Sequence, residues 1–172
     1  MKLVALTAAA VLTALVVAGP ALAQQPAAPA APAAAAPPAP TPGPTLGQAL
    51  KAMDLAKAAA AKLNLTLSCV VVDSRGDLVA VTRMDGARYY TTDVARGKAL
   101  TSATFGRASG EMVQFGSTPL FQNFNTAAQG RLYPIQGALP IQKNNVTIGA
   151  MGCSGASAQQ DEDAVRAALA AF

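Results

Sequence analysis

Hydrophobic residues recur at three- and four-residue steps over residues 45–63, which is the spacing of one face of an α-helix. Thr45 precedes the first of them and suits the N-cap position, because its hydroxyl can accept a hydrogen bond from the first helical turn. Lysine and aspartate occupy the other faces. The pattern predicts an amphipathic helix whose apolar stripe is Leu46, Ala49, Leu50, Met53, Ala56, Ala60 and Leu63.

Two β-branched segments follow, at residues 65–73 and 77–84. Ser74, Arg75 and Gly76 separate them, and Gly76 can adopt the positive φ that a short hairpin loop requires. The first segment begins with alternating polar and apolar residues and then becomes apolar on both faces. This change predicts a strand near the centre of a sheet, covered by helices on at least one side.

A second helix is predicted over residues 91–106. A threonine N-cap and Asp93 in the first turn both favour the positive end of the helix dipole, and Gly106 suits the end of the helix. The small residues Ala95, Ala99 and Ala103 form a stripe that allows close packing. A further short helix is expected over 108–116, whereas residues 117–133 show no clear periodicity.

A second pair of strands is predicted at residues 133–142 and 146–154, joined by a tight turn through Lys143, Asn144 and Asn145. Ser157 and Gln160 then have the spacing of a capping box at the start of a last helix. Its buried face consists of Ala164, Val165, Ala168, Leu169 and Phe172. Two hairpins with helices between and around them predict an α+β fold with an antiparallel sheet.

The residues before this domain predict export. Lys2, an apolar stretch and Ala21-Leu22-Ala23 resemble a cleavable signal peptide over residues 1–23. An uncleaved anchor is the alternative, but the stretch is short for one. Residues 24–44 are almost entirely proline and alanine, which predicts an extended spacer. The expectation is a periplasmic or secreted protein whose folded domain covers residues 45–172, with no membrane span after cleavage.

Composition excludes several kinds of site. The formal net charge is +4 and the basic residues are scattered, so nucleic acid is not an expected partner. The chain contains no histidine, which excludes His-based general base catalysis and His ligation of a metal or haem. Cys69 and Cys153 both fall within predicted strands, where a cross-strand bridge is geometrically awkward. We therefore expect buried free thiols, with a disulfide as the alternative.

The end of the first hairpin is one candidate site. Arg83, Met84 and Asp85 close the second strand, and Gly86 permits a sharp exit. These residues fit a simple turn with an Asx hydrogen bond at Asp85. They also fit the rim of a pocket in which Arg83 or Lys98 binds a carboxylate, such as a haem propionate or a small organic acid.

Two charged residues are candidates for acid–base chemistry. Glu111 is the only acidic residue between Asp93 and Asp161, so it could act as a general base or pair with Lys98. A solvated helix position is the alternative for each of the two. Gly137 and Pro140 suit an edge strand or bulge first and a ligand contact second.

Four ordered motifs resemble the GlcG/HbpS-like family, which includes the C-terminal domain of PduO proteins. They are "VVVDSRGDLVAVTRMDGA", "DVARGKALTSATFGR", "GALPI" and "IGAMGCSGASAQQDEDAVRAAL", and together they span the folded domain. The resemblance implies a profilin-like antiparallel sheet of about five strands with packed helices. It also implies assembly into homo-oligomers, and haem as the cofactor, since some members bind or degrade it.

The chain departs from the family pattern in two ways. It has no histidine, and Ala138 stands where the family usually has a second glycine. An iron ligand would therefore have to come from Met84, Met112, Met151, Tyr89, Tyr90, Tyr133 or a cysteine.

Three functions remain open at this point: a small-molecule or haem-binding module, an enzyme on a small acidic or carbonyl compound using Glu111 and Lys98, and a structural or partner-binding domain. The predicted ligand-binding residues are Arg83, Met84, Asp85, Gly86, Lys98, Gly137 and Pro140.

Overall fold

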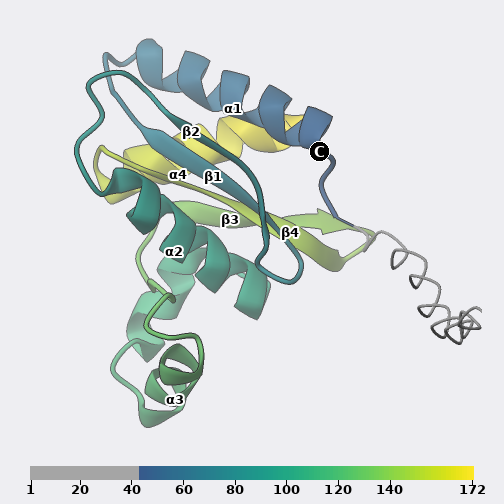
Figure 1. Cartoon of the computed structure of the whole chain (residues 1–172), viewed down its shortest axis with the longest axis vertical. Helices are drawn as coiled ribbons and strands as arrows, with labels where there is room; N and C mark the ends of the chain where they lie inside the picture. Colours follow the sequence, from purple (N-terminus) through teal and green to yellow (C-terminus); the bar gives the residue numbers. More distant parts are fainter. Residues whose placement is uncertain (1–42) are drawn as a thin grey trace, which may run out of the picture. The chain divides into compact units, whose positions relative to one another are not determined.

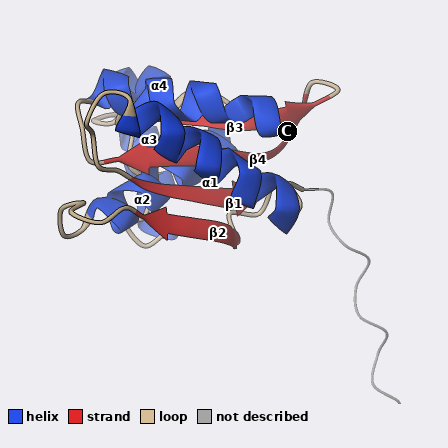
Figure 2. Cartoon of the chain, turned by 90° about the horizontal axis from the view of Figure 1, so that it is seen from above, coloured by secondary structure: helices blue, strands red, loops and turns tan. Residues whose placement is uncertain are grey.

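The two predicted hairpins form one sheet in the computed structural model, which describes residues 43–172. The proposed signal peptide and nearly all of the spacer lie outside these described residues. The strands are β1 (Ser68–Asp73), β2 (Leu78–Arg83), β3 (Ala138–Lys143) and β4 (Val146–Ser154). They are antiparallel in the order β2-β1-β4-β3, so β1 and β4 join the two hairpins at the centre (Figure 2).

The predicted α+β class and antiparallel sheet are confirmed, with four strands instead of about five. The second hairpin is shorter than predicted because residues 133–136 do not join the sheet, and Gly137 contributes its carbonyl, which accepts the N–H of Cys153. The backbone N–H of Tyr133 donates to the carbonyl of Gly97 in a helix, at 3.2 Å, and not to a neighbouring strand. This segment therefore connects the sheet to a helix.

Helices cover both faces of the sheet (Figure 1). Helices α1 (Leu46–Ala61) and α4 (Ala158–Ala168) pack on one face, and α2 (Thr91–Phe105) packs on the other. In β1, Cys69 and Val71 belong to the core beneath α1 and α4, whereas Val70 and Val72 contact the α2 side. The stripe of Ala95, Ala99 and Ala103 on α2 packs against the sheet, as expected of small residues that allow close packing. The predicted N-cap at Thr45 and the predicted capping box at Ser157 are present, and Thr45 also completes a capping box with Gln48.

Residues 117–133, which show no periodicity, contain α3 (Pro119–Ala127). Thr118 caps this helix through its side chain and Pro119 occupies its first turn, an arrangement that favours helix initiation. Helix α3 lies beyond α2 from the sheet, next to the 3₁₀ helix η1 (Ser109–Phe115), as Figure 1 shows. A second 3₁₀ helix, η2 (Leu169–Ala171), follows α4. Among residues 43–172, no helix is long and apolar enough to cross a membrane.

The expectation of free thiols is wrong, because Cys69 and Cys153 form a disulfide. The two residues are direct partners in the β1–β4 register, with Cα atoms 4.1 Å apart. The N–H of Cys153 donates to the carbonyl of Gly137, on the side away from β1, so the cysteines form a non-hydrogen-bonded pair. Side chains approach most closely at such pairs, which makes the bridge possible.

Candidate functional site: a pocket of tyrosines and arginines

Helix α2 begins in an uncommon conformation. Its N-cap is Tyr90, with a left-handed φ of 74° and no side-chain cap, so the predicted threonine cap is wrong. The Thr91 hydroxyl donates instead to the carbonyl of Arg88, at 2.8 Å. A bulky residue at positive φ is strained, and such strain concentrates at functional sites. The left-handed turn presents the Tyr90 ring beside the first turns of α2.

Tyr133 approaches the same turns from the segment that precedes β3. A Cβ atom on Gly97 would lie 2.6 Å from the Tyr133 ring, so this close approach requires glycine. The phenol oxygens of Tyr90 and Tyr133 are 3.0 Å apart and share a hydrogen bond. The rings of Tyr89 and Tyr90 lie 6.0 Å apart. The three tyrosines of the chain therefore gather at one place.

Tyr90 and Tyr133 line a cavity of about 390 Å³, here called the tyrosine pocket. Two arginines also line it, Arg96 from α2 and Arg131 from the loop after α3, together with one carboxylate, Asp93. The Nε atom of Arg96 is buried without a hydrogen-bond partner among residues 43–172. A buried donor of this kind normally has a partner, so its orphaned state is an exception that calls for an explanation. The remaining lining residues are Gly97, Leu100, Gln129 and Gly130.

The pocket alters the acidity of one phenol. The hydrogen bond with Tyr90 raises the pKa of Tyr133 above its ordinary value of 10.0, and desolvation and the nearby Asp93 act in the same direction. Tyr133 is therefore a neutral phenol at physiological pH. It can donate a hydrogen bond, and it becomes an anionic ligand only by losing its proton.

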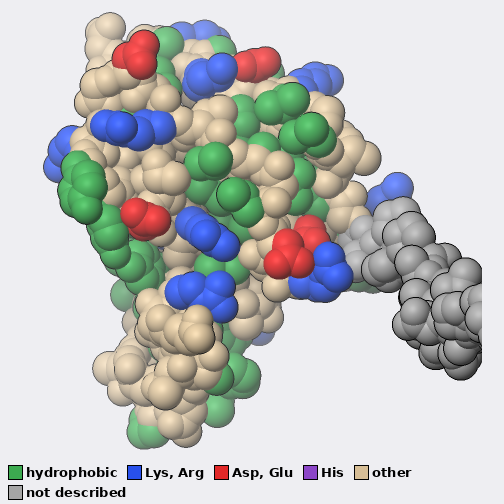
Figure 3. All heavy atoms as spheres, viewed as in Figure 1, with side chains coloured by type: hydrophobic (Ala, Val, Ile, Leu, Met, Phe, Trp, Pro, Cys, Tyr) green, Lys and Arg blue, Asp and Glu red, His purple; other side chains and the backbone are tan. Residues whose placement is uncertain are grey.

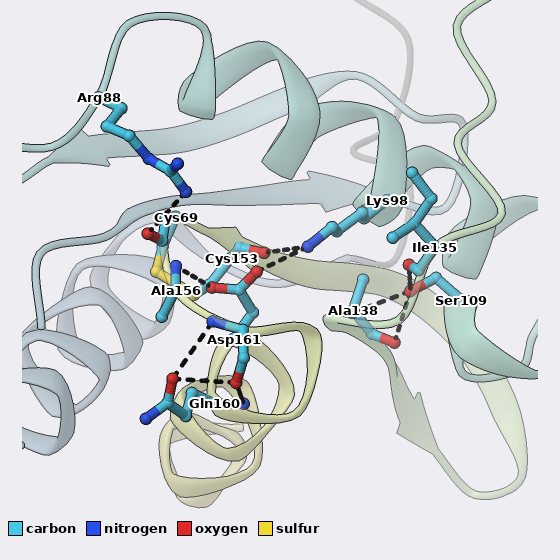
Figure 4. A network of polar contacts seen from close by, with 12 residues as sticks. Cys69, Arg88, Lys98, Ser109, Ile135, Ala138, Cys153, Ala156, Gln160 and Asp161 are labelled. Carbon is cyan, nitrogen blue, oxygen red and sulfur yellow. Dashed lines mark hydrogen bonds and ion pairs between the residues drawn. A yellow bond between two sulfur atoms is a disulfide. The ribbon is translucent and has the colours of Figure 1, made fainter.

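Lys98 does not face the tyrosine pocket, although it is adjacent to Gly97. Its ammonium group is buried and lies 2.8 Å from Asp161 Oδ2 and 3.2 Å from the carbonyl oxygen of Cys153 (Figure 4). Asp161 also accepts a hydrogen bond from the N–H of Ala156. Burial raises the pKa of Asp161, against the opposing effect of Lys98 and the backbone donor. This network ties α2 to the start of α4.

Glu111, the predicted partner of Lys98, lies elsewhere. It is exposed and lines a separate cavity of about 620 Å³ with Glu162 and Arg166, which form their own ion pair at 2.9 Å. Gly137 does meet Lys98, since a Cβ at this glycine would lie 2.6 Å from the ammonium nitrogen. The glycine therefore makes room for the buried lysine.

The end of the first hairpin forms a third, separate place. Arg83, Met84, Asp85 and Gly86 line a cavity of about 230 Å³. The Arg83 guanidinium donates to the carbonyl of Ala87 at 2.8 Å, and the Met84 sulfur accepts the N–H of Leu67 at 3.4 Å. Pro140 lies within β3, paired with Ala150. The structure thus does not bring the predicted ligand-binding residues together, and their assigned roles stay predictions.

Two features of these sites escaped sequence reasoning. Asp161 precedes Ala164, Val165 and Ala168 at helical spacing, which places it on the buried face of α4. That spacing could have identified it as a buried acid in need of a cation. The pairing of Tyr90 with Tyr133 joins residues 43 positions apart and leaves no local pattern. Among residues 43–172, no group of His, Cys, Asp and Glu side chains is arranged to hold a metal ion.

Known proteins resemble this chain over the whole folded domain. An uncharacterized 15.0 kDa protein from the dhaT-dhaS intergenic region of Citrobacter freundii is 30% identical over 131 residues, covering 74% of this chain and 91% of that protein. The corrinoid adenosyltransferase PduO of Salmonella typhimurium is 28% identical over 116 residues, which are 66% of this chain and only 34% of PduO.

Solved structures share the fold. A double mutant of Streptomyces reticuli HbpS has a TM-score of 0.70 at 28% identity, covering 82% of this chain and 96% of that chain. The complex of PduOC with haem has a TM-score of 0.68 at 23% identity, covering 76% and 95%. The family model described as haem degrading protein HbpS-like matches residues 45–170. This match covers the folded domain almost completely, so the chain belongs to the HbpS-like family.

Proposed function

We propose that this chain is an exported haem-binding domain and that the tyrosine pocket holds the haem. The family model is described by haem degradation, and a solved relative of the same fold is a haem complex. The observation that carries the assignment of the site is the orphaned Nε of Arg96 beside the hydrogen-bonded phenols of Tyr90 and Tyr133.

Among the side chains that can bind haem iron, elimination leaves the tyrosines of the pocket. Histidine is absent, both cysteines are bridged, Met84 accepts a backbone N–H, Met151 is fully buried in the core, and Met112 lines a different cavity. Tyrosine is an established axial ligand of haem iron. Tyr133 is the better placed of the pocket's two tyrosines, because its ring is fixed against Gly97.

The charges of the pocket suit the propionates of haem. Arg96 and Arg131 provide two guanidinium groups against the one carboxylate of Asp93. Guanidinium groups bind carboxylates through paired hydrogen bonds, and the pocket is lined by two of them. When bound, haem would supply a redox-active iron. The chain's own part is to hold the propionates at the arginines and to control the proton on Tyr133 Oη.

A haemin titration followed by the Soret absorbance tests this proposal, and the chain supplies its own control. Tyr133→Phe should abolish the spectral change, whereas Tyr89→Phe should leave it unaltered, because Tyr89 is 91% exposed and does not line the pocket. Tyr90→Phe removes the main cause of the raised pKa of Tyr133, so haem should bind at a lower pH than in the parent. Equal binding by all three variants would contradict the site.

Export is supported by two features of different kinds. The first 23 residues have the pattern of a signal peptide, and the Cys69–Cys153 disulfide is of a kind that persists in oxidising compartments. Expression of the full chain with subcellular fractionation tests this point. A mature protein that begins near residue 24 in the periplasm or medium is the expected result, and retention of the full-length chain in the cytoplasm would refute it.

We also propose that the domain forms homo-oligomers. Exposed apolar side chains on the edge strand β2, Leu78 and Val81, support this assembly. Light scattering coupled to size exclusion would measure the mass of the particle. A monomer at micromolar concentration would rule it out.

A further inference from the structure

Four of the five phenylalanines of the chain line a single cavity outside the tyrosine pocket. This cavity, the phenylalanine pocket, has a volume of about 270 Å³ and lies between the end of α2, η1 and α3. The Phe105 ring stacks on Phe121 and meets Phe124 edge-on, with centroids 5.7 Å apart in both pairs. The remaining lining residues are Phe115, Met112, Leu120, Thr118 and Arg107.

The phenylalanine pocket differs from a closed hydrophobic core, because several of its apolar side chains are exposed to solvent. Phe121 and Met112 are buried, as core residues would be, but Phe115, Phe124 and Leu120 are 39%, 47% and 68% exposed. Large apolar side chains that stand around an opening keep unfavourable contact with water. An apolar ligand in the opening would remove that contact with water. The packing of Phe105 against Phe121 and Phe124 already fixes the positions of these rings.

One charged group stands at the pocket, the exposed guanidinium of Arg107. It forms no ion pair with any carboxylate among residues 43–172. The hydroxyl of Thr118 is already engaged, since it donates to the carbonyl of Phe115 and accepts the N–H of Phe121. Residues 117–130 contain no charged side chain, and the lobe of α3 shows neither blue nor red in Figure 3. Arg107 is therefore the available polar contact for an occupant.

We propose that the phenylalanine pocket binds a small organic anion with an aryl or short alkyl body and one carboxylate. The rings and Met112 would receive the apolar body, and Arg107 would bind the carboxylate. The volume is below the usual range for drug-sized ligands, which sets an upper limit on the size of the anion. This site is independent of the haem proposal, because the two pockets share no lining residue.

Methionine methyl NMR of the purified chain provides a local test. Met112 lines the pocket, whereas Met53 and Met151 are buried in the main core and Met84 lies at the end of β2. With the ¹³C-labelled methyl groups assigned through Met112→Leu, 3-phenylpropionate is titrated as the probe. We expect a saturable shift of the Met112 methyl and none at the other three.

Two further experiments remove the charge of the probe and the charge of Arg107, one at a time. The isosteric amide 3-phenylpropionamide should bind the parent about tenfold more weakly, and Arg107→Gln should weaken binding of the acid by the same factor. Lys51→Gln, which removes an exposed cation from α1 on the other face of the sheet, should have no effect. No Met112 shift, equal affinities for acid and amide, or a Met112 shift that depends on protein concentration without probe would each overturn the proposal.

Discussion

Replacing Asp161 by asparagine should destabilise the fold severely, because it leaves a buried cation without its anion. The side chains of Lys98 and Asp161 are each only 3% exposed, and their charged atoms are 2.8 Å apart. Removing one partner of a buried ion pair costs about 3 to 5 kcal/mol, because the other charge stays desolvated. Asparagine preserves the shape and an acceptor for the N–H of Ala156, so the loss measures the charge.

A surface pair with the same separation is the matched control. Lys57 and Asp54 are also 2.8 Å apart, but their side chains are 44% and 74% exposed. Asp54→Asn should therefore cost less than about 1 kcal/mol. Urea denaturation of parent and variants, with unchanged slope, gives both free energies of unfolding. If the two substitutions cost the same, burial does not determine the strength of these pairs and the reasoning fails.

A double mutant separates the pair from its surroundings. Lys98→Met combined with Asp161→Asn removes both charges and keeps an acceptor for the N–H of Ala156. It should be more stable than Asp161→Asn, because no unpaired charge remains. A double mutant that is less stable than the single one would show that the unpaired charge of Lys98 is not what destabilises Asp161→Asn.

Three further outcomes follow from the geometry. Replacing Cys69 and Cys153 by alanine should lower the free energy of unfolding in urea by about 4 to 5 kcal/mol, because the bridge spans 84 residues, and a loss below 1 kcal/mol would contradict this. The folded-state pKa of Tyr133 lies above the unfolded value of 10.0, so its stabilising contribution is present below pH 10 and is lost as pH rises through the raised pKa. Tyr90→Phe should lower that pKa in a spectrophotometric titration. Gly97→Ala should displace the Tyr133 ring and weaken haem binding, and unchanged affinity would remove Tyr133 from the site.

Local patterns in the sequence were sufficient for most of the secondary structure. The N-cap at Thr45, the capping box at Ser157 and the alanine stripe of α2 are properties of neighbouring residues, so they could be recognised without knowing the fold. Helix α3 escaped because its nine residues are too few to establish a period. Its Thr118-Pro119 start was the available signal.

Contacts between distant residues could not be predicted in this way. The partner of Lys98 lies 63 positions away, whereas the prediction of Glu111 rests on its being the only acidic residue between Asp93 and Asp161. The disulfide depends on the register between β1 and β4, which no local pattern determines. The resemblance to a family indicated the sheet, but it could not place Tyr90 beside Tyr133. A site formed by long-range contacts needs the structure.

Adjacent residues of α2 show how one segment serves both stability and binding. On one side, Gly97 leaves room for the Tyr133 ring, and its carbonyl accepts the backbone N–H of Tyr133. On the other side, Lys98 reaches Asp161 beneath Gly137, at the opposite end of the segment 133–137. The ion pair therefore helps to fix the segment that carries Tyr133. A loss of haem affinity in Asp161→Asn would be indirect, whereas a loss in Tyr133→Phe at unchanged stability would identify a direct ligand.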